Sequence, residues 1–385
     1  MSTPKQHAVA ADYVFDGIVV QRNAAVVIEG PRIVAVMPRA ELSAAVPVRA
    51  LPDETWLAPG FIDLQVNGGG DVLFNDEPTV EGIRAIAAAH RKFGTTALLP
   101  TLISDTPEKT KAALAAVEEL AASEPSVIGI HLEGPFLSPE RPGVHDLRHI
   151  RMPTAEDCAM LLAPRSGATV VTLAPERVPE GFVHQLTRAG IRVCLGHSMA
   201  TYVETRAAMA QGLTGFTHLF NAMRPLASRE PGPIAAALES PDASFGMIVD
   251  GAHVDPAMLR LALWGAARPM LVTDAMPPVG GSRFNFALYG EEITVQDGRC
   301  TRKDGTLAGA VLDMATAVRN CVRLLGVPLE VALRFASVHP ARFIGLDHWL
   351  GRLAPGYRAD LVAINPKSAE VLETWLAGSH SACSR

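Results

Sequence analysis

Short apolar runs recur along the chain from residue 58 onward, and segments with a different period separate them. Eight runs have the length of strands: 59–67, 95–101, 127–135, 169–175, 191–197, 215–221, 245–251 and 269–275. The intervals carry apolar residues at helical spacing, as in 80–93, 107–122 and 201–211. Buried strands that alternate with amphipathic helices predict an α/β fold with a parallel (β/α)8 TIM-type barrel.

The two ends of the chain have another pattern. Short strand-like segments joined by turns occupy 13–20, 25–28 and 33–36, and the turn-rich segment 351–356 leads into a similar run at 359–365. We therefore predict a small β-sandwich domain built from both termini, residues 1–56 and 346–385, and a barrel domain over 57–345. We expect the tail, 379–385, to fray.

Polar residues stand at or near the C-terminal ends of the apolar runs: Gln65, Glu133, His197, His218, Asp250 and Asp274. In a barrel these ends meet at one mouth, where catalytic groups lie. One Glu and two His are a sufficient ligand set for a catalytic zinc ion with an open position. The alternative is that both histidines are satisfied core residues and that His131, on the same strand face, pairs with Glu133. A Glu inside an apolar run is costly to bury unless it is paired or binds metal, so the three together favour a metal site.

Five further residues each allow two interpretations, one functional and one in which the residue is structural or merely solvated. Asp274 could cap a helix, but a carboxylate near a divalent cation is suited to take a proton from water and pass it to a leaving group. His145, in a glycine-containing loop, and Asp250 and His253, at the mouth, could contact substrate or be merely solvated or structural. Arg229 could grip a phosphate at two points or be an exposed charge.

The composition and charge of the chain argue against some classes of function. The 385 residues are 48% hydrophobic and 19% charged, which is ordinary for a globular protein. A net charge of -6 without a basic cluster argues against nucleic acid, and no apolar run approaches the roughly 18 residues that a membrane span needs. The N-terminus lacks the features of a signal peptide, and the five cysteines are scattered without a CxxC pair. We expect a cytoplasmic protein that acts on a small molecule.

Six segments carry a family resemblance: Pro-Gly-Phe-Ile-Asp at 59–63, His-Leu-Glu-Gly-Pro at 131–135, Leu-Gly-His-Ser-Met-Ala at 195–200, Thr-His-Leu-Phe-Asn-Ala-Met at 217–223, Asp-Gly-Ala-His at 250–253 and Leu-Val-Thr-Asp-Ala at 271–275. Together they resemble the N-acetylglucosamine-6-phosphate deacetylases, a family of the amidohydrolase superfamily. The first segment marks only an amidohydrolase. The second, the fourth and the pattern Asp-Gly-x-His-x-Asp, in this order, are specific to the deacetylases.

The resemblance implies a role for each matching residue. Glu133, His197 and His218 would bind one divalent ion per chain, with zinc as the expected metal. Asp274 would be the general acid and base, and His145 would polarise the acetamide carbonyl. The residues that match positions around the sugar, its phosphate and its acetyl group are Asn221, Ala222, Arg229, His253 and Leu307. Members of the family are typically dimers, in which Arg229 could serve the neighbouring subunit.

The chain departs from many amidohydrolases at one place. They carry His-x-His after the Pro-Gly-Phe-Ile-Asp segment and use it for a second metal, whereas this chain has Gln65-Val66-Asn67. Amides bind transition metals poorly compared with imidazole. We therefore predict a one-metal site.

The function that the resemblance implies is hydrolysis of the acetyl group from N-acetyl-D-glucosamine 6-phosphate, which gives D-glucosamine 6-phosphate and acetate. One alternative is the same reaction on N-acetylgalactosamine 6-phosphate, because the C4 epimer changes a single hydroxyl group. Another, of a different class, is a metal-free amidohydrolase-like scaffold protein that binds partners. The complete set of Glu133, His197, His218 and Asp274 argues against the scaffold.

Overall fold

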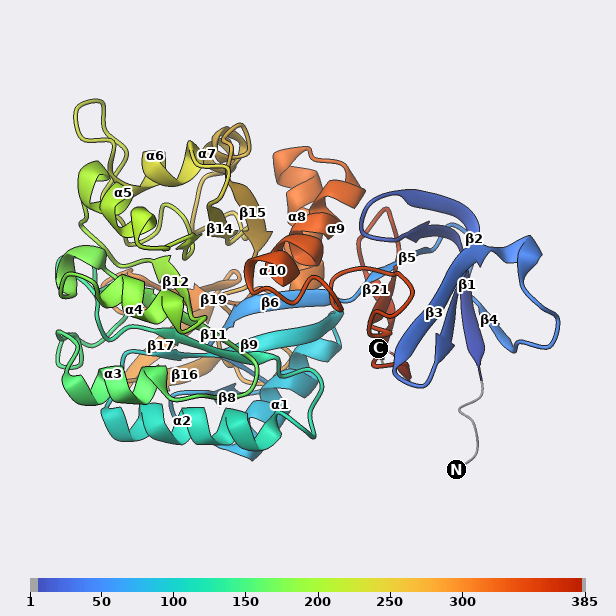
Figure 1. The fold of residues 1–385 in the computed structure, drawn as a ribbon, viewed down its shortest axis with the longest axis horizontal. Helices are drawn as coiled ribbons and strands as arrows, with labels where there is room; N and C mark the ends of the chain where they lie inside the picture. The colour runs from blue at the N-terminus through green and yellow to red at the C-terminus, as the bar shows by residue number, and fades with distance from the viewer. Residues whose placement is uncertain (1–5, 383–385) are drawn as a thin grey trace. The chain divides into compact units, whose positions relative to one another are not determined.

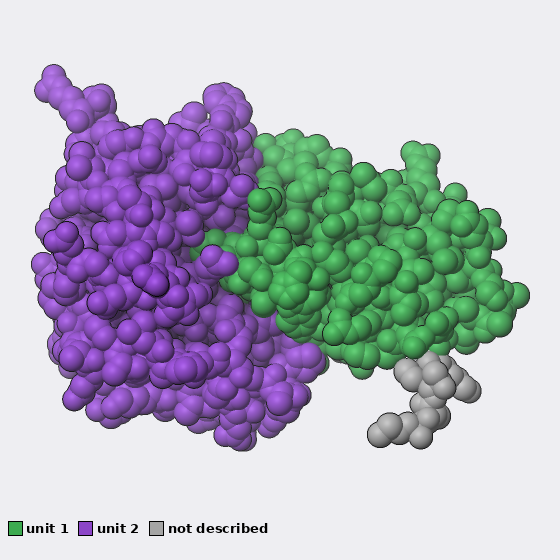
Figure 2. Space-filling model, viewed as in Figure 1, with its two compact units in different colours: residues 1–63, 90–97, 313–385 green, residues 64–89, 98–312 purple. Residues whose placement is uncertain are grey.

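The computed structural model describes residues 6–382 and divides into two compact units. Unit 1 takes in residues 1–63, 90–97 and 313–385, and unit 2 takes in 64–89 and 98–312 (Figure 2). The predicted domain boundaries, near residues 57 and 346, stay a prediction.

An eight-stranded parallel sheet, rolled into a nearly closed barrel, forms the larger part of the fold (Figure 1). Its strands follow the chain order: β6 (Phe61–Val66), β9 (Thr95–Ile103), β10 (Gly129–Glu133), β11 (Ala168–Leu173), β12 (Arg192–Leu195), β13 (Gly215–Phe216), β14 (Ser244–Met247) and β15 (Arg268–Leu271). A bridge between Val66 and Ala275 links the two ends of the sheet. Each predicted apolar run overlaps one of these strands, so the predicted (β/α)8 barrel is confirmed.

Burial explains why the barrel strands read as continuous apolar runs. Every residue of β9 and of β10 is buried, because core side chains cover one face of the strand and helices cover the other. The later barrel strands, β12 to β15, are short, and the chain turns into a loop directly after each of them. Polar residues at the strand ends are therefore carried into these loops, away from the apolar layers.

Helices connect the barrel strands, and several begin at a side-chain cap. The helices are α1 (Val80–Arg91), α2 (Pro107–Leu120), α3 (Ala155–Leu162), α4 (Phe182–Arg188), α5 (Tyr202–Ala210), α6 (Gly232–Leu238) and α7 (Pro256–Ala262), with a 3-10 turn η2 (Pro175–Arg177). Thr106 caps α2 by accepting from the backbone N–H of Lys109, and Thr201 forms a reciprocal capping box with Glu204 at α5.

A small antiparallel sheet follows the last barrel strand, and the apolar pattern did not predict it. It consists of β16 (Asn285–Leu288), β17 (Glu291–Gln296), β18 (Arg299–Thr301) and β19 (Leu307–Ala310). Its buried side packs Leu288, Ile293 and Cys300 in one cluster. A two-stranded hairpin, β7 (Gly68–Gly69) and β8 (Val72–Leu73), lies in the same unit.

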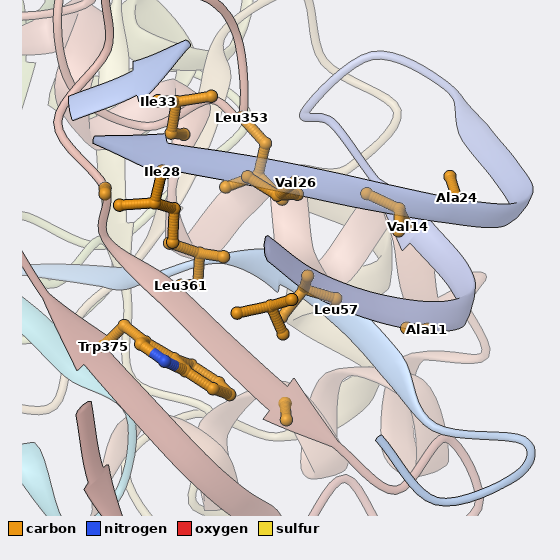
Figure 3. Packing of buried hydrophobic residues seen from close by; sticks show 13 residues of the cluster. Ala11, Val14, Ala24, Val26, Ile28, Ile33, Leu57, Leu353, Leu361 and Trp375 are labelled. Atoms are coloured by element: carbon orange, nitrogen blue, oxygen red, sulfur yellow. The ribbon is translucent and has the colours of Figure 1, made fainter. Parts of the chain in front are cut away.

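Unit 1 contains a second eight-stranded sheet, and its strands come from both ends of the chain. They are β1 (His7–Phe15), β2 (Val20–Glu29), β3 (Arg32–Pro38), β4 (Val48–Ala50), β5 (Trp56–Pro59), β20 (Leu361–Ile364), β21 (Val371–Leu376) and β22 (Ser379–Ala382). One face covers an apolar cluster that includes Val26, Leu57, Leu361 and Trp375 (Figure 3). The predicted β-domain built from both termini is confirmed.

The remaining helices also belong to unit 1. They are the 3-10 turn η1 (Arg39–Glu41), α8 (Met314–Leu325), α9 (Leu329–Ala336) and α10 (Val338–Phe343). Asp313 caps the start of α8, and Gly326, with φ 72°, ends it in the left-handed conformation.

The prediction that the tail frays is wrong for residues 379–382. These residues form β22 and pair with β21, for example Ser381 with Thr374. Because β22 is short and rich in small polar residues, it lacks the alternation that marks a strand. The rest of the tail lies outside the described residues.

Two findings concern membrane-spanning helices and cysteines. Within residues 6–382, no helix is both long and apolar enough to cross a membrane. The four cysteines described, Cys158, Cys194, Cys300 and Cys321, are free thiols, and burial raises the pKa of Cys194 to about 12.

Candidate metal and substrate site

The C-terminal ends of three barrel strands and the loops that follow them bring Glu133, His197 and His218 together. Glu133 ends β10, and the two histidines follow β12 and β13. Glu133 Oε1 lies 3.2 Å from His197 Nε2 and 2.9 Å from His218 Nε2, and the two Nε2 atoms are 3.1 Å apart. Their ligand atoms all lie within 4.8 Å of one another, and the three side chains are buried. This convergence of two imidazoles and a carboxylate has the donor set of a catalytic zinc site.

The surroundings prepare these groups to act as ligands. His197 Nδ1 donates to the carbonyl oxygen of Arg141, 2.9 Å away, which leaves the Nε2 lone pair free to face the cluster. Burial acts to raise the pKa of Glu133, but the adjacent His197 and His218 outweigh it and hold that pKa well below its usual value. Glu133 is therefore an anion. The residues present fit a divalent cation.

Asp274 lies beside the cluster and is held by two amides. Its Oδ1 accepts from Asn67 Nδ2 at 2.6 Å and from Gln65 Nε2 at 3.1 Å. Gln65 Nε2 also lies 3.1 Å from Glu133 Oε2, so one amide links both carboxylates. Burial, together with the negative charge of Glu133, raises the pKa of Asp274. An Asp in this setting accepts a proton more readily than a solvated one.

The cluster opens into a cavity of about 350 Å³. All but one of the predicted site residues line it, and the residues that do so are Glu133, His145, His197, His218, Asn221, Ala222, His253, Asp274 and Leu307. The exception is Arg229. It lies in an exposed loop just before α6 and does not line this cavity. The cavity has the size range of small-molecule sites.

His145 and His253 are each fixed by hydrogen bonds at Nδ1. His145 Nδ1 lies 2.8 Å from Ser104 Oγ, and burial together with the neighbouring His197 lowers the pKa of His145 well below its usual value. His253 Nδ1 donates to Asp250 Oδ2 at 2.6 Å. Burial acts to raise the pKa of Asp250, but this bond outweighs it, and the pKa is lowered. Asp250 thus orients His253 and does not itself line the cavity.

The backbone is strained at the residues that face the cavity. His197, His218 and Asp274 have φ values of 49°, 32° and 51°, in the left-handed region that non-glycine residues avoid. Such a conformation costs on the order of 1–3 kcal/mol for each residue and persists only where its surroundings impose it. At Asp274 the backbone N–H donates to Gln65 O and the carbonyl oxygen accepts from Ala310 N–H.

His131 has a different role from the one weighed for it in the sequence. Its Nδ1 lies 3.0 Å from Leu64 O and its Nε2 lies 2.7 Å from Thr172 Oγ1. His131 therefore joins three barrel strands beneath the cluster, and His197 and His218 are the partners of Glu133.

Sequence reasoning missed several residues of the site. Ser104, at the end of β9, contacts His145, and the residues Arg141, Met276, Thr306 and Gly309 line the cavity. Ser104 follows a barrel strand directly, so the rule that selected the other strand-end residues could have found it. Nothing in the pattern points to the residues around Leu307, because they belong to the unpredicted sheet.

Comparison with known proteins agrees with this geometry. Residues 56–380 match the Amidohydrolase family, and the chain belongs to this family, whose members depend on metal ions. The chain is 43% identical to the N-acetylgalactosamine-6-phosphate deacetylase of Shewanella sp. over 84% of its own length and 82% of that protein. It is 37% identical to the N-acetylglucosamine-6-phosphate deacetylase of Haemophilus influenzae, over 90% and 92% of the two chains. The crystal structure of N-acetylglucosamine-6-phosphate deacetylase from Pasteurella multocida superimposes with a TM-score of 0.95 at 35% identity, and covers 98% of this chain and 100% of that one.

Proposed function

We propose that this protein is a metal-dependent hydrolase that removes the acetyl group from N-acetyl-D-glucosamine 6-phosphate. The observation that carries the proposal is the convergence of Glu133, His197 and His218 beside Asp274 in one cavity of about 350 Å³. Relatives that span most of the chain are named as deacetylases of phosphorylated N-acetyl amino sugars. The products are D-glucosamine 6-phosphate and acetate.

Glu133, His197 and His218 would hold one divalent ion, and two imidazoles and a carboxylate suit zinc. When bound, this ion supplies Lewis-acid polarisation and lowers the pKa of a water molecule. Gln65 and Asn67 stand where a second metal would need imidazoles, and their N–H groups are directed to carboxylates.

The chain's own residues then move the protons. Asp274 accepts a proton from the attacking water, whose oxygen bonds to the acetamide carbon. His145 donates a hydrogen bond to the carbonyl oxygen as negative charge develops there. Asp274 delivers its proton to the nitrogen while the carbon–nitrogen bond breaks, so that an amine and acetic acid form without a covalent intermediate. The acid then passes its proton to the amine or to water and leaves as acetate.

Substrate binding is shared among the other residues of the site. Asn221, the backbone of Ala222 and His253 hold the sugar, and Leu307 packs near the acetyl group. We assign the phosphate to Arg229 and His253. Arg229 is exposed and does not line the cavity of its own chain, which supports the proposal that it serves the neighbouring subunit of a homodimer. A cytoplasmic location stays a prediction.

The second candidate is the galacto epimer of the same substrate. It is favoured by one observation, the 43% identity to the N-acetylgalactosamine-6-phosphate deacetylase of Shewanella sp.. The metal cluster and Asp274 serve both reactions, because the epimers differ only at C4.

Acetate release from the two phosphorylated sugars, measured in parallel with and without a chelator, tests the proposal. We expect release from N-acetylglucosamine 6-phosphate that stops with chelator and returns with zinc. Faster release from the galacto epimer would favour the second candidate. A zinc-loaded protein that is inactive on both would contradict the deacetylase reading.

A further inference from the structure

Ser104 approaches the ring of His145 from the end of β9. Its backbone N–H donates to His145 Nδ1 at 3.2 Å, and its Oγ lies 2.8 Å from the same nitrogen. Both residues are buried, Ser104 with 2% and His145 with 3% of its surface exposed. All the hydrogen bonds of the His145 ring among residues 6–382 are made at Nδ1, while the ring lines the cavity.

The backbone N–H determines which nitrogen of His145 carries the proton. A backbone N–H can only donate, so the nitrogen that it faces must offer a lone pair. In a neutral imidazole, the other nitrogen then bears the hydrogen. The opposite tautomer and the imidazolium would each set two N–H groups against one another at Nδ1. The contact with Ser104 therefore selects the form with hydrogen on Nε2.

The peptide that provides this N–H is itself held in place. The carbonyl oxygen of Ser104 accepts from Tyr289 Oη at 2.5 Å. On the preceding residue, Asn75 donates to Ile103 O at 2.9 Å and accepts from Ile103 N–H at 3.1 Å. The end of β9 is thus fixed on both sides of the N–H that meets His145.

The chain also leaves room for the serine hydroxyl. A Cβ at Gly134, next to the metal-cluster residue Glu133, would lie 2.2 Å from Ser104 Oγ. Gly134 has φ 92°, a conformation that side chains rarely adopt. A glycine is therefore required where the hydroxyl passes.

We propose that Ser104 is a positioning residue that keeps His145 as the neutral tautomer with hydrogen on Nε2, ready to donate to the acetamide oxygen. The role of the donated bond in the reaction rests on the proposed deacetylase function, whereas the tautomer itself does not. His145 then acts as a hydrogen-bond donor and transfers no proton, so Asp274 carries out the proton transfers.

Nitrogen NMR of the zinc-loaded protein, labelled with ¹⁵N in histidine, tests the tautomer without any substrate. The His145→Gln variant identifies the two ring signals of His145 by their loss. At neutral pH we expect a pyridine-type shift for Nδ1 and a pyrrole-type shift for Nε2. A protonated Nδ1, in either the other tautomer or the imidazolium, would overturn the proposal.

Kinetics of the Ser104 variants test the positioning role. Ser104→Ala removes one of the two bonds at Nδ1, and we expect kcat to fall by about 3- to 10-fold with little change in KM, since a hydrogen bond is worth about that much. Ser104→Thr keeps a hydroxyl and should recover much of the rate. Tyr289→Phe keeps the ring but frees the Ser104 carbonyl, and should lower kcat by a smaller factor.

Ser126→Ala is the matched control, because Ser126 is a buried serine whose hydroxyl bonds to Glu124 at the start of the segment that leads into β10. It should leave kcat unchanged. Ser104→Ala keeps the backbone N–H, so the nitrogen shifts should stay the same while kcat falls; if the variant altered only thermal stability and left kcat unchanged, Ser104 would be merely structural and the positioning role would fail. If the tautomer were as expected but no acetate were released, the proposed function would fail and the tautomer assignment would stand.

Discussion

The two eight-stranded sheets of this protein bury different kinds of side chain. The sheet of unit 1 is mainly antiparallel and covers a cluster of Val, Ile, Leu and Ala with Trp375. The barrel sheet is parallel, and the ends of its strands carry Glu133, His197, His218 and Asp274 in a buried group. Parallel strands bring equivalent ends to one edge, so polar residues that are far apart in the chain meet there.

The buried polar groups of the two sheets have different partners. In unit 1 the side chains of Arg358 and Asp360, both on the segment that enters β20, pair with each other and with backbone groups. At the barrel mouth, the polar groups converge on a point in a cavity. We expect substitutions at the mouth to affect turnover and substitutions in the unit 1 sheet to affect stability.

The largest effect on turnover is expected at the metal ligands. His197→Ala or His218→Ala leaves two ligands for the ion, so the protein should lose bound metal and its activity should fall to that of the chelated enzyme. Elemental analysis and acetate release check this. The exposed His184→Ala is the control, and it should keep both. A variant that retains its full metal content would remove that histidine from the ligand set.

Asp274→Asn should have the next largest effect. It keeps the shape and the hydrogen-bonding capacity of the side chain but cannot shuttle a proton, so kcat should fall by about 10²- to 10⁴-fold while metal content is unchanged. Asp242→Asn, in an exposed loop, is the control. Near-normal turnover of Asp274→Asn would show that another group carries the proton.

A smaller loss, confined to phosphorylated substrate, is expected for Arg229→Ala. A charge-assisted bond to phosphate is worth about 1.5 to 3 kcal/mol, so kcat/KM should fall by about 10- to 100-fold for the 6-phosphate. The slow reaction of unphosphorylated N-acetylglucosamine should hardly change. An equal loss on both substrates would mean that Arg229 supports the fold or the metal cluster.

Mixed dimers sharpen the prediction for Arg229. If this residue reaches the site of its neighbour, subunit exchange between Arg229→Ala and Asp274→Asn proteins creates one site with both residues intact. Activity should then recover. Absence of recovery despite verified exchange would place Arg229 in the site of its own chain.

Asp360→Ala should leave turnover unchanged and reduce stability. It leaves Arg358, which is 7% exposed, without its carboxylate, and breaking a buried pair in this way costs about 3–5 kcal/mol. Thermal unfolding measures the loss, and acetate release per folded protein measures turnover. Replacing both residues with Leu and Met should recover most of the stability. A fall in kcat measured on fully folded Asp360→Ala protein would contradict the expectation that substitutions in the unit 1 sheet affect stability and not turnover.

The barrel could be predicted from sequence because its signals are local. The runs that became β9 and β10 are largely apolar and buried throughout, and Glu133, His197, His218 and Asp274 lie at the end of a strand or a few residues after it. The same position rule applies to Ser104, but no local signal relates it to His145, 41 residues later in the chain. That contact depends on how the loop after β10 returns over β9.

The sheet that carries Leu307 could not be predicted for a physical reason. In β17 only Ile293 is buried, and its neighbours are exposed or half-exposed. The sequence of this strand is therefore nearly as polar as that of a loop. Strand β22 escaped notice in the same way. Arg229 shows another limit of prediction from sequence. The sequence shows that a guanidinium group is present, but not how far it lies from the cavity.

The left-handed backbone at His197, His218 and Asp274 has a consequence for the evolution of this chain. Glycine adopts that conformation more easily than histidine or aspartate, so a glycine at these positions relieves the backbone strain while it abolishes turnover. Selection for heat resistance alone therefore acts against the residues that carry the chemistry.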